Sequence, residues 1–418
     1  MDTPKKYILL MDDDHPSKVQ KVSRALNTSL TSSAELSSQV RAHQIFEKGD
    51  GLFFKNLNVA VVENIEAEKM KSVAEQDSNI IYWEEDKVFS IEDSQSLLQS
   101  MKEDLAALSI KLEELEKIIQ AKSEEDIPKD PKFSWGMEAI GLKESSLTGK
   151  GVKVAILDTG FFADHPDFQN RDLIGKSLIK NVSWDKDGNG HGTHCAGVAV
   201  GDKSSSGVKY GVAHEATIAI GKVLKDNGLG RSSGIIDAID WALEKKMDII
   251  SMSFGLGVKI GEAPSPIFEL IGRKALNQNC LLIAAAGNDS KRPNLPRPVS
   301  SPANAESIMA VAALDLQLKV ANFSNGGLNA SDGGRIDLAA PGVEVFSAYS
   351  MNAADPSLYK SMNGTSMATP HVAGLAALYK EAFPKLSAAE LWLKLEKNAK
   401  KLSGQKFRDV GNGLVYLV

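Results

Sequence analysis

Three residues of this chain have the side chains that nucleophilic catalysis requires: Asp158, His191 and Ser366. Asp158 ends an apolar run, His191 lies between two glycines, and Ser366 precedes the alanine-rich apolar run 372–379. A serine hydroxyl is a weak nucleophile, so it needs a general base and a group that orients that base. A hydroxyl at the start of a helix also lies beside free backbone N–H groups, which can stabilise an oxyanion. The three residue types therefore predict acyl-transfer chemistry.

Each of these residues also has a structural interpretation when it is taken alone. An aspartate before Thr-Gly commonly caps a turn, and a single histidine is more often a packing residue than a base. His194, on the same predicted helix as His191, is the expected structural histidine, because the sequence offers no third ligand for a metal site made by the pair. The order Asp158, His191, Ser366 along the chain favours catalysis.

This order and the surrounding residues resemble those of the subtilisin-like serine proteases, the subtilase or S8 family of peptidases. The segments 154–160, 190–194 and 363–371 carry the resemblance. It implies a serine endopeptidase of broad specificity in which Ser366 attacks the scissile carbonyl and forms an acyl-enzyme. His191 would transfer the proton, and Asp158 would orient the imidazole.

The resemblance also implies which residues bind the oxyanion and the substrate. The backbone N–H of Ser366 and the side chain of Asn288 would donate to the oxyanion, although Asn288 is alternatively a turn residue after a strand. An extended peptide would pair as an added strand with two exposed edges. The expected substrate-binding residues are Gly228, Leu229, Gly230, Ser253, Phe254, Gly255, Ala285, Gly287 and Ser300. Ser300 is small and neutral, which disfavours a strict preference for a charged side chain.

A structural calcium site is implied by the same resemblance, although the chemistry itself requires no cofactor. Asp167, in the segment 164–167, matches an aspartate ligand of the family. The loop 201–208 would add oxygens, but Ser204 replaces the usual amide side chain and Lys203 adds a positive charge. Ca²⁺ takes about six to eight oxygen ligands, some of which backbone carbonyls can supply. The alternative is that Asp167 is a solvated loop residue.

These residues are far apart in the sequence, and the pattern of residues 132–418 predicts the scaffold that brings them together. Apolar runs typical of buried strands alternate with helix-like segments such as 233–245. The predicted strands are 152–157, 218–223, 249–252, 281–285 and 308–312. This alternation predicts an α/β domain with a largely parallel sheet and helices on both faces. Asp158 would then lie at the carboxyl edge of the sheet, where sites of such folds form.

Residues 1–93 are predicted to form a separate domain. Strands at 7–11, 57–62 and 79–83, helices at 18–26 and 66–75, and a further strand near 42–46 give a ferredoxin-like α+β order. Ahead of a subtilisin-like domain, this unit resembles the inhibitory pro-domain of the family (inhibitor I9), an intramolecular partner. The segment 81–88 resembles the strand that leads into the cleft, which places the activation cut after Glu92. The alternative is an interaction module unrelated to zymogen control.

Residues 94–131 have a different pattern. Apolar residues recur at heptad a and d positions over about three heptads, which predicts an amphipathic helix at 94–121. The seam consists of Leu98, Met101, Leu105, Leu108, Leu112, Leu115 and Ile119. It either pairs with a second copy of the chain or folds back on its own domains. The charged, proline-containing segment 123–131 is expected to be an exposed linker and a cleavage region.

Composition disfavours several classes of partner. The chain has 418 residues, of which 43 % are hydrophobic and 24 % charged, and its net charge is -6. This balance argues against nucleic acid, and no apolar run approaches the ~18 residues of a membrane span. The five apolar residues at 7–11 are too few for a signal peptide, which predicts a cytoplasmic protein, or a secreted one if the native N-terminus differs or another export route is used. Cys195 and Cys280 are expected to be buried free thiols.

Two functions from other classes stand as alternatives to peptide hydrolysis. A catalytically silent peptide-binding scaffold would have no chemical need for Asp158, His191, Ser366 and Asn288 together. A peptide ligase or macrocyclase would use the same acyl-enzyme but would have to exclude water. The sequence between His191 and Ser366 has no long insertion that predicts a lid for this purpose. Product analysis separates hydrolysis from transfer.

Overall fold

The computed structural model describes residues 5–35, 45, 50–91, 132–169, 171–330, 333–349 and 357–418. The predicted helix 94–121, the linker 123–131 and Glu92 lie outside these residues. The domain boundaries at 93 and 131 therefore stay predictions.

The larger part of the described chain is built around a seven-stranded sheet whose pairings are all parallel. The strand order is β14-β13-β12-β11-β7-β9-β8. The strands are β7 (Lys153–Asp158), β8 (Leu173–Ser177), β9 (Thr217–Lys222), β11 (Ile249–Met252), β12 (Leu281–Ala285), β13 (Met309–Leu314) and β14 (Leu338–Pro341). All residues of β11, β12 and β13 are buried, as expected for parallel strands with helices on both faces. The predicted α/β fold is confirmed, and the edge strands β8 and β14 are additional to the predicted ones.

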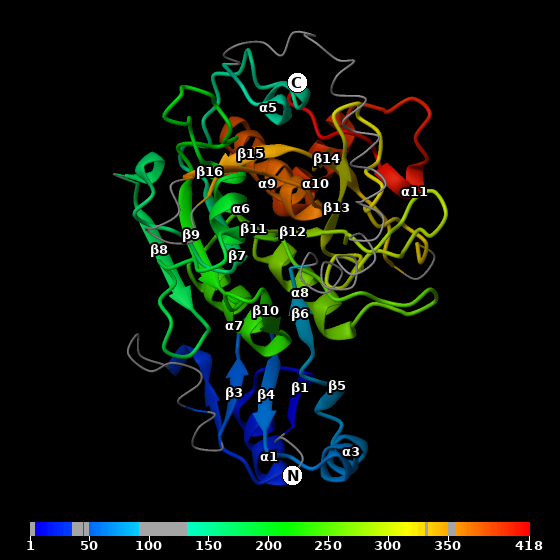
Figure 1. Ribbon diagram of the computed structural model, residues 1–418. Coiled ribbons are helices and arrows are strands. Elements are labelled where there is room, and N and C mark those ends of the chain that lie inside the picture. Colours follow the sequence, from blue (N-terminus) through cyan, green and yellow to red (C-terminus); the bar gives the residue numbers. More distant parts are fainter. Residues whose placement is uncertain are drawn as a thin grey trace, which may run out of the picture.

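Helices cover both faces of this sheet (Figure 1). α6 (His191–Val200) and α9 (Thr365–Ala382) pack against each other on one face, and α7 (Ser232–Glu244) and α8 (Pro266–Asn277) lie on the other. α8 begins where Ser265 accepts the backbone N–H of Ile267 and Pro266 occupies the first turn, both favourable at a helix start. The remaining elements are α5 (Trp135–Ala139), η2 (Pro166–Phe168), β10 (Leu229–Arg231), β15 (Val345–Ala348), β16 (Tyr359–Met362), α10 (Ala388–Asn398) and α11 (Phe407–Val410).

The N-terminal part contains a five-stranded sheet of order β2-β3-β4-β1-β5. Its elements are β1 (Lys6–Met11), α1 (Pro16–Leu26), β2 (Leu30–Ser32), η1 (Ser33–Glu35), β3 (Gly51–Phe54), β4 (Val59–Glu63), α3 (Ala67–Gln76), β5 (Ile80–Glu85) and β6 (Val88–Ser90). The four antiparallel strands β3-β4-β1-β5 have the ferredoxin-like order. The predicted strand near 42–46 lies outside the described residues except for Ile45, which is helical, and the second strand of the motif is instead the fully buried β3.

The two faces of this smaller sheet are both buried, because alternate residues of a strand point to opposite sides. Tyr7, Leu9 and Met11 pack with Val22 of α1 and Met70 of α3 in one cluster. On the other face, side chains that include Ile8, Leu10 and Phe54 belong to the same apolar cluster as the core of the larger domain. Figure 1 shows this sheet, in blue, beside the ends of α7 and α8. The smaller domain is therefore joined to the larger one by a continuous apolar interface.

Within the described ranges, no helix combines the length and apolar character needed to cross a bilayer. Cys195 and Cys280 are buried free thiols, which confirms that prediction.

Candidate active site

Asp158 and His191 come together at the carboxyl edge of the parallel sheet. Asp158 is the last residue of β7 and His191 is the first residue of α6. The imidazole Nδ1 lies 2.8 Å from Oδ1 of Asp158, and both side chains are buried. Gly190 precedes α6 with φ of 92°, a conformation that favours glycine, so the chain can turn sharply before the histidine. Asp158 is thus placed to fix the orientation of the His191 ring.

The two histidines of α6 have opposite electrostatic environments. Burial lowers the pKa of His191, but Asp158 and Cys195 raise it by more, so that the pKa lies well above 6.5. Burial lowers the pKa of His194 to about 3, and its Nε2 lies 2.9 Å from the backbone O of Val345. His194 is therefore held neutral in the core, as expected for the structural histidine.

Ser366 lies in the first turn of α9 and is almost fully buried. Its Oγ donates to the backbone O of Ser253 at 3.2 Å, and its own backbone O accepts from the hydroxyl of Ser253 at 2.8 Å. The described hydrogen bonds include none between Ser366 Oγ and the His191 ring. In structures without a substrate, the distance between a catalytic hydroxyl and its histidine often exceeds that of a hydrogen bond. A rotation about χ1 of Ser366 redirects its Oγ.

Cys195 contacts both His191 and Ser366, the predicted base and nucleophile, and was not itself predicted as a site residue. Its Sγ lies 3.8 Å from Nδ1 of His191 and 3.5 Å from the backbone O of Ser366. In the described residues, Asp158, His191 and Cys195 are the one group of possible metal ligands that lies within 4.8 Å. The signal was present in the sequence, because positions 191 and 195 are one helical turn apart.

Asn288 lies beyond the end of β12 and contacts Thr365, the residue before the predicted nucleophile Ser366. Its Oδ1 accepts from the backbone N–H and the hydroxyl of Thr365 at 2.8 and 2.9 Å. With the oxygen held in this way, the Nδ2 donor remains for another acceptor, and a Cβ on Gly364 would lie 3.4 Å from it. This places an amide donor near the start of α9, where the Ser366 backbone N–H also lies.

The chain around Gly287, just after β12, is tightly packed. Gly287 has φ of 111°, and a Cβ at this position would lie 2.2 Å from Nδ2 of Asn325 and 2.5 Å from Oγ of Ser300. Ser300 is fully buried, and Ala285 ends β12. Only glycine fits at 287, because both the backbone conformation and the space exclude a side chain.

The expected substrate edges are occupied by the N-terminal domain's own chain. β6 pairs antiparallel with β10, so that Ser90, Phe89 and Val88 lie opposite Leu229, Gly230 and Arg231. On its other side Ser90 exchanges two backbone hydrogen bonds with Gly255, and the Ile91 N–H donates to the O of Gly228 at 3.0 Å. Figure 1 shows β6 leaving the smaller sheet and entering the larger domain beside β10.

The side chain of Phe89 fills an aromatic pocket at this edge. It is 1 % exposed, and its ring packs edge-on against Phe254 at 6.2 Å and Phe268 at 5.5 Å between centroids. Phe254 was predicted at the cleft, whereas Phe268 was not, since it comes from α8, fourteen positions further along the chain. The sequence alone gives no signal for this contact.

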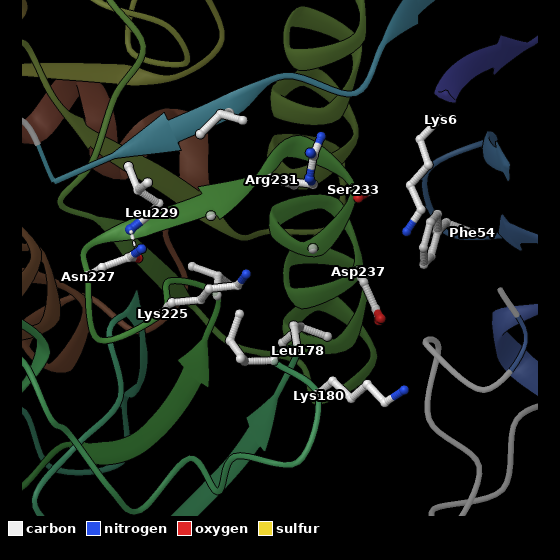
Figure 2. Close-up of a pocket in the computed structure, with 15 residues that line it drawn as sticks. Lys6, Phe54, Leu178, Lys180, Lys225, Asn227, Leu229, Arg231, Ser233 and Asp237 are labelled. Atoms are coloured by element: carbon white, nitrogen blue, oxygen red, sulfur yellow. Dashed lines mark hydrogen bonds between the residues drawn. The ribbon is translucent and has the colours of Figure 1, made fainter. Parts of the chain in front are cut away.

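A cavity of about 330 Å³ lies next to β6, between the two domains. Figure 2 shows Lys6 and Phe54 of the smaller domain on one side, and Lys180, Arg231 and Asp237 of the larger domain on the other. Leu229 and Gly230, two of the predicted substrate-binding residues, also line this cavity.

Asp167 lies outside this region, in η2, and its environment is aromatic. Its Oδ2 accepts from the hydroxyl of Tyr210 at 2.6 Å and its Oδ1 from that of Tyr359 at 2.9 Å. The loop that would add calcium ligands uses carbonyls internally, since the O of Val208 accepts from Ser204 and the O of Asp202 from Tyr210. Two phenolic donors at one carboxylate do not fit a cation site, so these contacts weigh against Asp167 as a calcium ligand.

The chain is similar to known proteins over the region that carries this site. Residues 149–413 match the model of the subtilase family. The chain is 38 % identical over 279 residues to subtilisin DY of Bacillus licheniformis, which covers 67 % of this chain and 94 % of that protein. It is 37 % identical over 278 residues to an intracellular serine protease of Paenibacillus polymyxa, covering 64 % and 80 % of the two chains. A solved cold-adapted subtilisin-like serine proteinase is 30 % identical, with a TM-score of 0.56 over 68 % of this chain and 98 % of that chain.

Proposed function

Since this chain belongs to the subtilase family, whose members are serine endopeptidases, we propose that it hydrolyses peptide bonds with Ser366, His191 and Asp158. We further propose that residues 1–93 inhibit the enzyme until they are released. The observation that carries the second proposal is the position of β6, which pairs with β10 and Gly255 where a substrate strand is expected to bind.

The proposed mechanism assigns one role to each catalytic side chain. Ser366 Oγ attacks the scissile carbonyl while His191 accepts its proton, and the imidazolium then donates that proton to the leaving amine. Asp158 holds the Nδ1–H side of the ring and stabilises the imidazolium. The backbone N–H of Ser366 and Nδ2 of Asn288 donate to the oxyanion. Water then hydrolyses the acyl-enzyme by the same proton transfers in reverse.

Main-chain pairing supports a broad specificity, because every peptide has the N–H and C=O groups that the edges bind. The Phe89 pocket adds a preference for a large apolar side chain at one position. The antiparallel register supports an inference about that position. Ser90 lies opposite Gly255, and continuing the same register by two residues reaches Ser253, whose O contacts Ser366. We infer that cleavage follows Glu92. The aromatic pocket would then bind the residue three positions before Glu92, which in this chain is Phe89.

Acidic residues of the smaller domain support its docking as an inhibitor. Asp86 accepts from the backbone N–H and the hydroxyl of Ser233 at 2.9 Å, at the N-terminus of α7. Glu84 accepts from Ser265, the residue before α8, at 2.8 Å. Carboxylates at helix N-termini are stabilised by the free N–H groups and by the helix dipole. These contacts and the shared apolar core hold β6 in the cleft.

The chemistry requires no cofactor, and subtilisins often bind structural calcium. For this chain we propose that the Tyr210 and Tyr359 hydroxyls replace a cation at Asp167. The predicted helix 94–121 either pairs with a second copy of the chain or folds back on its own domains. Sedimentation of the variant Leu105→Glu, Leu112→Glu tests self-association, because only pairing of two copies makes the mass depend on this seam.

A fluorophosphonate probe tests whether the serine is activated. Such a probe phosphonylates a nucleophilic serine through the same attack and remains bound, so it separates an enzyme from a silent scaffold. Once residues 1–93 have been released, we expect the wild type to gain the mass of the probe less that of hydrogen fluoride, because fluoride leaves as Ser366 Oγ bonds to phosphorus and the serine proton is lost. Ser366→Ala should gain none. An unlabelled wild type that also leaves casein intact would contradict the proposal. Casein fragments with free termini, rather than joined peptides, distinguish hydrolysis from ligation.

A further inference from the structure

A lysine is buried beside the acid of the active site, and the mechanism above assigns it no role. Lys222 ends β9 and pairs in the parallel ladder with Asp158 at the end of β7. Its side chain is fully buried, and its Nζ donates to the backbone O of Thr159 and, at 2.6 Å, to Oδ1 of Asp226. A buried ammonium group is costly unless it is paired, so both contacts constrain the segments that make them.

Thr159 connects this lysine to the acid and to the helix of the base. Its backbone N–H donates to Oδ1 of Asp158 at 2.7 Å, and its Oγ1 accepts from the backbone N–H of Gly192 at 2.9 Å. The same hydroxyl donates to Asp187 at 2.8 Å. Lys222 therefore holds a turn that contacts both Asp158 and the first turn of α6.

Asp226 connects the lysine to the turn in front of His191. Its backbone O accepts from Nδ2 of Asn189 at 2.9 Å, and Oδ1 of Asn189 accepts from the backbone N–H of His191 at 3.3 Å. A Cβ on Gly188 would lie 2.4 Å from Oδ2 of Asp226, so the glycine allows the carboxylate to approach this turn closely.

Asp226 also begins the loop that binds the strand in the cleft. Two residues later, the O of Gly228 accepts from the N–H of Ile91 at 3.0 Å, while the Gly228 N–H donates to the O of Lys225 at 2.8 Å. Figure 2 shows the hydrogen bond between Asn227 and Leu229 that closes the same turn. The position of Gly228 therefore depends on how Asp226 is anchored.

We propose that Lys222 and Asp226 are positioning residues that hold the substrate edge at Gly228 in register with Asp158 and His191. The Lys222–Asp226 ion pair connects the Gly228 edge to the turn at Asp158. Asn189 connects Asp226 to His191. Misplacement by ~1 Å in such a site can lower a rate about 10²-fold. A substrate that does not reach Gly228 gains little from this alignment. The inference rests on the proposed hydrolysis.

The test compares two p-nitroanilide substrates that have the same residue before the scissile bond, assayed with the full chain once its activity has reached a plateau. One is a tetrapeptide that spans Gly228, and the other is a single N-acetylated residue that ends before it. For Lys222→Met we expect kcat/KM to fall at least ~10-fold for the tetrapeptide and less than ~3-fold for the single residue. Asp226→Asn should act in the same direction. The double variant should be no worse than Lys222→Met, because the two changes remove one pair.

Lys176→Met is the matched control, since the Lys176 side chain pairs with Asp237 of α7 at 2.6 Å and has no described hydrogen bond to Thr159 or Asp226. This variant should leave the ratio of kcat/KM for the tetrapeptide to kcat/KM for the single residue unchanged. Asp226 is 53 % exposed, so Asp226→Asn tests the inference even if Lys222→Met unfolds in a thermal melt. Equal losses on both substrates, or none in Asp226→Asn, overturn the inference. A wild type that hydrolyses neither substrate contradicts the proposed function instead.

Discussion

Ser90 and Gly255 exchange two backbone hydrogen bonds, the N–H of Ser90 donating to Gly255 at 3.0 Å and the N–H of Gly255 donating to Ser90 at 2.9 Å. On the opposite side β6 pairs with β10. The N-terminal domain thus places its own strand between two edges of the larger domain. A strand held on both sides has no unpaired edge, which explains why a short segment docks stably.

Ser90→Pro should weaken this docking. Proline has no N–H, so the O of Gly255 loses its partner. A lost hydrogen bond costs about 1 kcal/mol, which lowers the equilibrium constant for docking about fivefold and raises the small fraction of open cleft by the same factor. We expect a correspondingly higher initial rate of casein cleavage by the uncut chain, whose length is checked by intact mass. Ser90→Ala, which keeps the N–H, should behave as the wild type; equal rates for both variants would contradict this account.

The pH dependence should reflect the environment of His191, which must be neutral to accept the proton of Ser366. Burial lowers the pKa of His191, but Asp158 and Cys195 raise it by more, to well above 6.5. The raised pKa stabilises the protonated, inactive base, so kcat/KM should fall as the pH drops through that value, and the acidic limb should lie above pH 6.5.

Asp158→Asn removes the charge that raises this pKa. We expect the acidic limb to move to lower pH and the plateau of kcat to fall by about 10⁴, because the ring is no longer held in the required tautomer. A pH–rate profile of kcat/KM for both proteins measures the shift. A limb that does not move would show that Asp158 does not set the pKa of His191.

Asn288→Ala should lower kcat while leaving KM nearly unchanged. Its amide donor acts on charge that develops in the transition state, and the loss of one such donor in a subtilisin costs about 10²–10³ in kcat. Steady-state kinetics on one peptide substrate are sufficient. A rise in KM at constant kcat would instead indicate that Asn288 binds the ground state of the substrate.

Asp167 should behave as a hydroxyl-bonded carboxylate. Tyr210→Phe removes the 2.6 Å donor to a buried oxygen, which costs about 1–3 kcal/mol and should lower Tm by several degrees. In the Ser366→Ala background, which prevents self-digestion, EDTA and CaCl2 should give the same melting curve. A calcium-dependent rise in Tm that Asp167→Asn abolishes would restore Asp167 as a metal ligand.

The sequence predicts the parallel sheet and the helix that contains His191 and His194, because long apolar runs and adjacent glycines are local signals. The helix after Ser366 was predicted only from the apolar run 372–379, whereas α9 begins at Thr365 and includes Ser366 in its first turn. The second strand of the smaller domain was misplaced, since Gly51–Phe54 is a short run whose burial depends on β2 and β4. By composition alone, the short stretch near 42–46 indicates a strand as strongly as Gly51–Phe54 does.

Contacts between distant segments were not predictable in the same way. The hydroxyls of Tyr210 and Tyr359 reach Asp167 from 43 and 192 residues away. Phe268 joins the Phe89 pocket only because α8 lies beside β6, and Lys222 reaches the backbone O of Thr159 from 63 residues away. Residue types and spacing are sufficient to predict the catalytic groups, whereas the residues proposed to orient them become visible only in the folded structure.

The most direct test of self-inhibition is intact mass over time for the wild type and Ser366→Ala, with casein present. We predict that the wild type shortens to a product that begins between residues 93 and 131 and that casein cleavage accelerates as it does so. Ser366→Ala should keep its full length and leave casein intact. A wild type that cleaves casein at its full rate while uncut would contradict the claim that β6 blocks the cleft.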